Sequence, residues 1–162
     1  MLRSGIALWL ASALLPAAAA AEPTKARPWH GSIGVGGHLS LTGPAERGGE
    51  AVAVVYPGAS FGRYGMRLAA RAFDPDGIDA GMVTTGIIYE AAAARPRLAM
   101  ALHADLGVAL PDARAVTGAG VETVLWIVGP FAIGLDSTAH LVWDGLDTEL
   151  ILSGTGTLRL AR

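Results

Sequence analysis

Large apolar residues alternate with small or charged residues along Arg97–Leu110, which reads RLAMALHADLGVAL. A β-strand points successive side chains to opposite faces, so this spacing predicts a strand with one apolar face and one small or charged face. The apolar face is continuous for about 10 residues, the length with which a tilted strand crosses a bilayer. Taken alone, the segment fits a helix equally well, because Ala, Leu and Met are good helix formers and Pro96 can occupy a first helical position. The apolar set is Leu98, Met100, Leu102, Ala104, Leu106, Val108 and Leu110.

Alternating or β-branched stretches recur through the rest of the chain, and they favour the strand. The further candidate strands are 32–42, 50–56, 63–73, 81–89, 116–128, 131–143 and 149–160. Gly, Pro and Asp residues separate them, as at Asp74–Gly77 and Asp144-Gly145, which are turn signals. About eight regularly spaced strands with short turns predict an all-β barrel or sandwich. Because hairpin links and an even strand number leave no open edge, we expect a single eight-stranded antiparallel up-and-down β-barrel.

The first residues have the features of a secretory signal. Arg3 supplies a positive charge, Ile6–Leu15 form a short apolar core, and Ala19–Ala21 are small residues suited to cleavage. We therefore expect a signal peptide at 1–21, a short polar lead at 22–31 and the barrel at 32–162. The chain has no cysteine, which rules out disulfides and thiolate metal sites and argues against a lipid-anchored lipoprotein.

The composition points to an apolar exterior or a very large core. Of the 162 residues, 52% are hydrophobic and only 16% are charged, which is few for a surface that faces water. No second hydrophobic run of about 18 residues follows the signal, so we expect no transmembrane helix. The formal net charge of -2 gives no reason to expect nucleic acid as a partner.

Charged residues gather on the face of the strands opposite the bulky apolar one. Both signs are present, and because an isolated buried charge is costly, we expect these side chains to pair inside a narrow barrel. The apolar face would then point outward, as it does in membrane barrels. The predicted interior charge network, with a structural role, is Arg63, Arg67, Arg71, Asp105, Glu122, Asp136 and Arg159.

The aromatic residues beyond the signal lie at or near predicted strand ends. Membrane barrels place girdles of aromatic residues at those levels, where an amphipathic ring meets the lipid headgroups. Aromatic residues that flank turns and fill the ends of the core would also lie near strand ends, so this alternative stays open. The predicted girdle comprises Trp29, Tyr56, Tyr64, Phe73, Tyr89, Trp126, Phe131 and Trp143.

An export signal, about eight alternating strands and no cysteine together resemble the small eight-stranded outer-membrane β-barrels. The transmembrane domain of OmpA and the OmpX-like proteins are familiar members of this group. The resemblance is one of pattern over nearly the whole mature chain, and it implies a location in an outer membrane and contact with lipid. Such barrels usually end in an aromatic residue recognised during assembly, whereas this chain ends Leu158–Arg162. Their outward loops also tend to be longer than the turns here.

Several residues could carry chemistry. His103 and Asp105 share one face, as do Asp136 and His140, and a cluster of this kind with Ser40 or Ser153 could form a hydrolase site. The spacing in the sequence does not show whether a nucleophile and a base lie within hydrogen-bond distance of each other. His38, His103 and His140 lack a recognised metal-ligand spacing and fit better as polar plugs in the interior.

Two further patterns suggest sites for anions, but each lacks a feature that such a site requires. The glycine-rich stretch Gly31–Gly37 lacks the Lys and the helix of a phosphate-binding loop. The ladder of Arg63, Arg67 and Arg71 could select anions in a pore, but side chains fill the interior of an eight-stranded barrel. We predict no catalytic residue, cofactor or metal.

The sequence thus predicts an exported, non-enzymatic outer-membrane β-barrel with a side-chain-filled interior and a structural or surface role. Its partner is membrane lipid, with no nucleic acid and no small-molecule substrate, and we expect a monomer. One alternative is a soluble periplasmic or secreted barrel of lipocalin type that binds an apolar ligand. A second alternative is a lipid-modifying enzyme of the outer membrane.

Overall fold

The computed structural model describes residues 30–42, 47–57, 60–61, 64–74, 80–95, 97–145 and 147–161. The predicted signal peptide at 1–21, most of the polar lead, and the site residues Trp29 and Arg63 lie outside the described residues.

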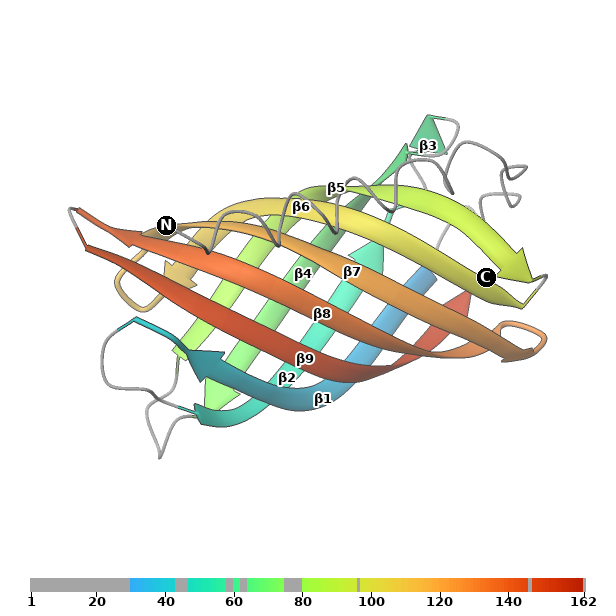
Figure 1. The fold of residues 1–162 in the computed structure, drawn as a ribbon, viewed down its shortest axis with the longest axis horizontal. Helices are drawn as coiled ribbons and strands as arrows, with labels where there is room; N and C mark the ends of the chain where they lie inside the picture. Colours follow the sequence, from blue (N-terminus) through green and yellow to red (C-terminus); the bar gives the residue numbers. More distant parts are fainter. Residues whose placement is uncertain are drawn as a thin grey trace, which may run out of the picture.

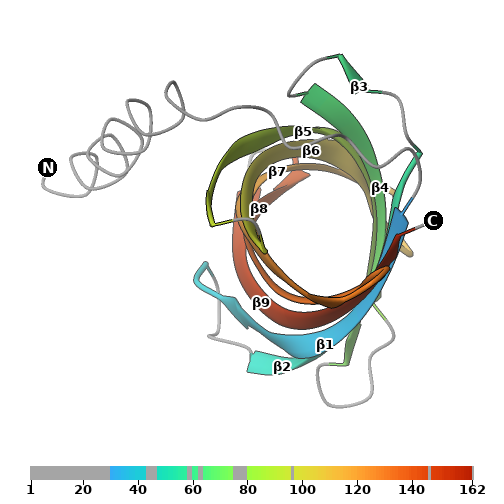
Figure 2. The same ribbon diagram turned by 90° about the vertical axis from the view of Figure 1, so that its right-hand side faces the viewer.

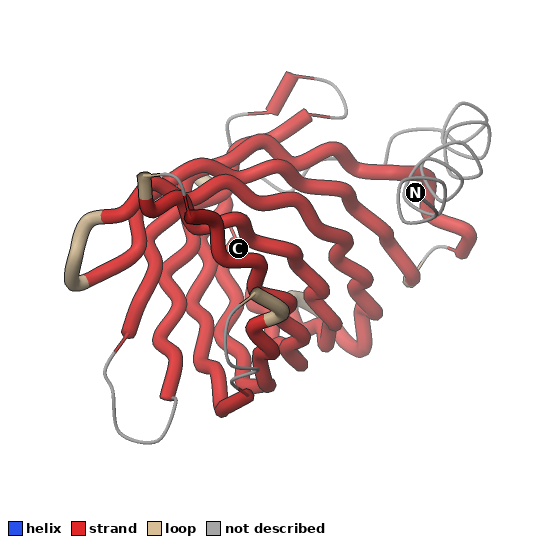
Figure 3. The backbone as a smooth tube through the Cα atoms, turned by 60° about the vertical axis from the view of Figure 1, so that its left-hand side comes forward, coloured by secondary structure: helices blue, strands red, loops and turns tan. Residues whose placement is uncertain are grey.

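Antiparallel strands make up almost all of the described chain (Figure 3). They are β1 (His30–Ser40), β2 (Arg47–Tyr56), β3 (Ser60–Phe61), β4 (Tyr64–Asp74), β5 (Ala80–Arg95), β6 (Leu98–Leu110), β7 (Arg114–Val128), β8 (Phe131–Asp144) and β9 (Asp147–Ala161). The described part of the chain contains no helix that is long and apolar enough to cross a membrane.

The strands close into a barrel, which confirms the predicted fold class. Each long strand pairs with its neighbours in the chain, β2 pairs directly with β4, and β1 pairs with β9 to complete the ring. Among the described residues, eight strands thus form the wall (Figures 1 and 2). The two-residue β3 pairs only with the start of β4 and lies outside the ring.

Several strands extend beyond the boundaries expected from the sequence, β1 and β5 among them. β1 begins at His30, inside the predicted polar lead, because the backbone there pairs with both Tyr56 and Ala161. β5 runs on to Arg95, where a connection was expected, because its backbone keeps a partner in β6 through a register shift after Ala91. In both cases pairing on a neighbouring strand overrides a polar or alanine-rich local sequence.

Most strands turn their apolar side outward, and β2 is an exception, with Val52, Val54 and Tyr56 inside. Ile33 on β1, Leu106 on β6 and Leu135 on β8 are 66%, 62% and 64% exposed. Residues of the opposite parity on the same strands, such as Asp105 and Asp136, point into the barrel. The segment 97–110, which fitted a helix as well as a strand, is held as β6 by continuous pairing with β5 and β7. The barrel therefore carries most of its large aliphatic side chains on the outside.

Two apolar layers lie inside the barrel, one toward each rim. The near layer, toward the rim with His30, consists of Val52, Val54, Tyr56, Ala69, Ile88 and Ala101. The far layer, toward the opposite rim, consists of Phe73, Met82, Ala109, Val116, Val142 and Ile151. Most of the buried charged side chains lie between these layers or beside the near one.

Candidate functional site

Three of the predicted network residues meet in the middle of the barrel. Arg67 on β4 lies between Asp105 on β6 and Asp136 on β8: its Nη1 is 3.4 Å from Asp105 Oδ2 and its Nη2 is 3.0 Å from Asp136 Oδ2. All three side chains are at most 1% exposed. Each residue has the inward parity of its strand, which is why distant parts of the sequence converge here.

Arg71 extends this arrangement toward the far layer. Its Nη2 donates to Asp136 Oδ2 and to Thr138 Oγ1, each at 3.2 Å, and its Nη1 donates to Glu50 Oε1. Glu50 was not among the predicted network residues. Its inward parity, shared with Val52, Val54 and Tyr56 of β2, was the signal that could have placed it there.

His103 bridges two carboxylates of the same group. Its Nδ1 is 2.9 Å from Asp105 Oδ2, and its Nε2 is 3.5 Å from Asp136 Oδ1 and 3.4 Å from Thr138 Oγ1. Thr138 donates its own hydroxyl proton to Asp136 Oδ1 at 2.6 Å. We call these seven residues the central cluster: Glu50, Arg67, Arg71, His103, Asp105, Asp136 and Thr138.

Two other predicted network residues form a separate group, the rim cluster of Tyr56, Glu122 and Arg159. Arg159 Nη2 donates to Glu122 Oε1 and to the Tyr56 hydroxyl, which in turn donates to Glu122 Oε2 at 2.7 Å. The Arg159 guanidinium also lies 4.3 Å from the centre of the Tyr56 ring, and His30 stacks on that ring at 4.2 Å. The predicted single network is thus two clusters.

Glycines of β7 make room for the interior histidines. A Cβ atom on Gly120 would collide with Nε2 of His103, and one on Gly118 would lie 2.8 Å from Nδ1 of His140. His140 is fully buried beside the central cluster, and neither of its ring nitrogens has a hydrogen-bond partner among the described residues. The barrel wall therefore carries no inward side chain at the two positions where these rings pack.

Of the other residues considered for chemistry, the buried His38 and Ser153 are paired across β1 and β9, and Ser153 is paired with Thr138 of β8. Ser40 donates its hydroxyl to the carbonyl of Thr42, and Ser153 Oγ has no partner among the described residues. His38 packs edge-on against Phe73 at 4.8 Å. Within the described ranges, no three His, Asp or Glu residues are arranged to hold a metal ion. The glycine-rich stretch Gly31–Gly37 lies in β1 and pairs on both sides.

The predicted aromatic girdle divides into outward and inward residues. Tyr64, Phe131 and Trp143 are exposed, and Tyr89 and Trp126 are partly exposed. Tyr56 and Phe73 were placed wrongly: their side chains are 3% and 6% exposed and point into the barrel. Tyr56 is drawn inward because its hydroxyl bonds Glu122, and Phe73 has the parity of Arg67 and Arg71 on β4.

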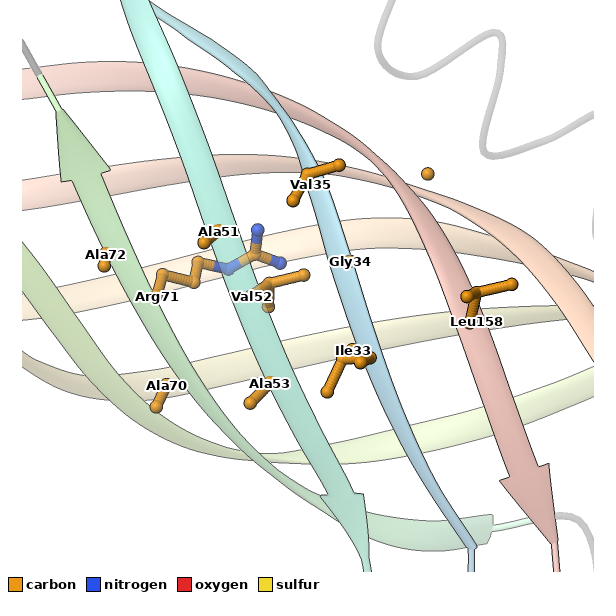
Figure 4. A pocket seen from close by; sticks show the side chains of 11 residues that line it. Ile33, Gly34, Val35, Ala51, Val52, Ala53, Ala70, Arg71, Ala72 and Leu158 are labelled. Carbon is orange, nitrogen blue, oxygen red and sulfur yellow. The ribbon is translucent and has the colours of Figure 1, made fainter.

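The outer wall has a shallow apolar hollow of about 550 Å³ (Figure 4). Alanines of β2 and β4 line it, and the larger side chains of Ile33, Val35 and Leu158 stand beside them. Arg71 contributes to its boundary, although its guanidinium group makes its ion pairs inside the barrel. The hollow is part of the outward apolar surface.

A closed antiparallel barrel with aliphatic residues outside and ion pairs inside has the architecture of the small outer-membrane β-barrels. Its exposed apolar belt is the surface that contacts lipid. This architecture confirms the one that the sequence pattern predicted.

Solved structures share this fold. The crystal structure of Neisserial surface protein A (NspA) is similar with a TM-score of 0.61 and 7% sequence identity, over 83% of this chain and 97% of that one. A structure from the de novo design of transmembrane beta-barrels is similar with a TM-score of 0.54 and 10% identity, over 82% of this chain and 96% of that one. No protein-family model and no curated protein matches the sequence.

Proposed function

We propose that this chain is a non-enzymatic outer-membrane barrel whose interior is closed by its own side chains, with a structural or surface role. The observation that carries the proposal is the central cluster, where Arg67 is 0% and Asp136 is 1% exposed. These side chains extend from β4 and β8 and meet across the lumen, which leaves their charged groups no contact with water.

The arrangement around the central cluster supports a closed interior. An ion passing along the barrel would have to separate Arg67 and Arg71 from Asp136 and then cross an apolar layer. Removing one partner of a buried ion pair costs about 3–5 kcal/mol, because the other charge is left uncompensated. We infer that the cluster acts as a cross-brace between opposite walls.

The positions of the polar groups favour this role over catalysis. A hydrolase site needs a nucleophile beside a base that is free to accept its proton. Here both ring nitrogens of His103 face carboxylates, and the hydroxyl of Thr138, 3.4 Å from Nε2, donates to Asp136. These groups also face the interior, whereas a lipid substrate would lie against the outer belt.

The lipocalin-like alternative requires the opposite orientation of the strands. It places the apolar face of β6 inside, around a ligand. Leu106, Val108 and Leu110 are instead exposed, while Ala101, His103 and Asp105 are buried. The outward apolar face therefore supports a membrane-spanning barrel.

The test is ion conductance of the refolded barrel in a planar lipid bilayer. The closed interior predicts no stepwise current above the lipid background. The double variant Arg67→Ala/Arg71→Ala removes the two long side chains that cross the lumen, and it is expected to raise conductance if it still folds. Strand content by circular dichroism in the same lipid shows whether each protein is folded. Steady ohmic channels from the folded unaltered protein would overturn the proposal.

A further inference from the structure

The central cluster contains more carboxylates than guanidinium groups. The guanidinium groups of Arg67 and Arg71 face the carboxylates of Glu50, Asp105 and Asp136. Two positive charges thus stand against three negative ones, which leaves one carboxylate without a counter-charge. The rim cluster cannot supply it, because Arg159 is already matched by Glu122.

An uncompensated charge at this position is unfavourable. The five charged side chains are buried, between the apolar layers, so water does not stabilise the surplus carboxylate. Isolated ionised groups are strongly disfavoured in such surroundings. A third positive charge inside the cluster would remove this cost.

His103 is the side chain positioned to provide that charge. One ring nitrogen is 2.9 Å from Asp105 Oδ2 and the other is 3.5 Å from Asp136 Oδ1. A neutral imidazole has one N–H donor and one acceptor nitrogen, so one of the two would face a carboxylate without a proton. When both nitrogens carry protons, both can donate to these carboxylates.

The groups around His103 agree with this assignment. Asp105 is on the same strand as His103, Arg67 approaches from β4, and Gly120 of β7 adds no side chain. Strand β8 contributes Asp136, Thr138 and His140. Of the two histidines beside the cluster, His140 has no hydrogen-bond partner for either nitrogen among the described residues. Of this pair, His103 is therefore the one that contacts the carboxylates of the cluster.

We propose that His103 is an imidazolium in the folded protein and is the third cation of the central cluster. The buried ion-pair system then has equal numbers of positive and negative charges. His103 is in this sense a proton-binding site built from two carboxylates on different strands.

The direct test is ¹⁵N NMR of histidine-labelled protein, refolded in detergent micelles at neutral pH. A doubly protonated ring gives two nitrogen resonances close together, whereas a neutral ring gives two that are widely separated. The chain has four histidines, and replacing His30, His38 and His140 one at a time assigns the remaining signal to His103. Closely spaced resonances are expected, and widely separated ones would overturn the proposal.

A mutant cycle between His103 and Glu50 tests the charge balance independently. Glu50 pairs with Arg71 and not with His103, so a coupling between the two positions reports on charge. If His103 is positive, His103→Gln leaves a net negative cluster, and adding Glu50→Gln restores neutrality. The double variant should then unfold at higher urea concentration than His103→Gln alone.

The two possible states of His103 predict different outcomes of this cycle. If His103 were neutral, Glu50→Gln would change the urea midpoint by the same amount in both backgrounds, and such additivity would contradict the proposal. If His103→Gln does not fold, the NMR measurement on the other variants still decides the matter. Neither result depends on whether the barrel conducts ions.

Discussion

Arg67 and Asp136 are separated by 69 residues in the chain, and their side chains meet inside the barrel with Nη2 and Oδ2 3.0 Å apart. The contact joins β4 to β8, which are not neighbours in the sheet. It therefore ties together opposite parts of the wall that backbone hydrogen bonds do not connect directly.

Replacing Arg67 with Leu should destabilise the barrel by about 3–5 kcal/mol, because Asp105 and Asp136 lose a buried counter-charge. The measurement is the urea unfolding midpoint of protein refolded in micelles. Arg114→Leu is the matched control, since Arg114 pairs loosely with Asp144 and Glu149 at 3.8 and 3.7 Å in a more exposed position. It should change stability by about 0–1 kcal/mol. An unchanged midpoint for Arg67→Leu would count against the central cluster as a brace.

Tyr56→Phe should cost about 1–3 kcal/mol, because it leaves Glu122 and Arg159 without the hydroxyl that bonds to both. The ring and its packing are retained, so the change isolates the hydroxyl. Tyr64→Phe is the control on the exposed surface and should leave the unfolding free energy nearly unchanged. Equal effects of the two substitutions would mean that the rim cluster adds no stability.

Gly120→Ala should destabilise the barrel or prevent refolding, because the new Cβ atom would collide with the His103 ring and with the carbonyl of Ser137. Overpacking of this kind costs about 1–3 kcal/mol. Gly154→Ala is a matched control, since a Cβ atom there would have no neighbour within 4 Å. We would compare the two variants by their refolding yield and by their thermal unfolding, followed by circular dichroism. Equal tolerance of both alanines would contradict the packing described for His103.

A charge on the outer belt should have a cost that depends on depth. Leu106 lies in the middle of β6 and Leu110 at its end, and both are exposed. Leu106→Arg is expected to cost about 2–4 kcal/mol in a lipid bilayer and Leu110→Arg about 0–1 kcal/mol. Urea unfolding in phosphatidylcholine vesicles measures the difference. Equal costs at the two positions would mean that β6 does not cross the hydrocarbon layer as its length suggests.

The barrel should also need an apolar environment in order to fold. Because its large aliphatic residues face outward, a far-UV circular dichroism spectrum typical of strands is expected with detergent micelles and not in plain buffer. The same spectrum from a clear monomeric solution without detergent would contradict the membrane-spanning barrel.

The alternation of residues was enough to predict the strands, the inward faces of those with a clear alternation, and most of the buried charges. Parity places Arg67, Asp105 and Asp136 inside, because only one side of each strand faces the lumen. It does not show which of them touch, since that depends on strand tilt and on the register around the closed ring. The division into a central and a rim cluster was for this reason not predictable.

The errors of prediction have a related cause. Tyr56 and Phe73 lie near strand ends, where an aromatic residue suits a girdle, but the face on which a residue lies is set by parity. Glu50 shares its face of β2 with Val52, Val54 and Tyr56, and because that face is the more apolar one, the rule that the apolar side faces outward did not place it inside. Thr138 shares the polar parity of Asp136 and His140, but its role depends on contacts with Asp136 and Arg71 that parity does not show.

The positions of the charged residues along the chain have a consequence for the order of assembly. Arg67 and Arg71 precede Asp136 by 69 and 65 residues, so both arginines lack that carboxylate until β8 has docked. Arg159 on β9 reaches Tyr56 on β2 across the seam where the first and last strands join. Contacts between such distant segments slow folding and make it cooperative. An incomplete barrel therefore holds charged side chains on its inner face without their partners, and these charges are paired only when the barrel closes.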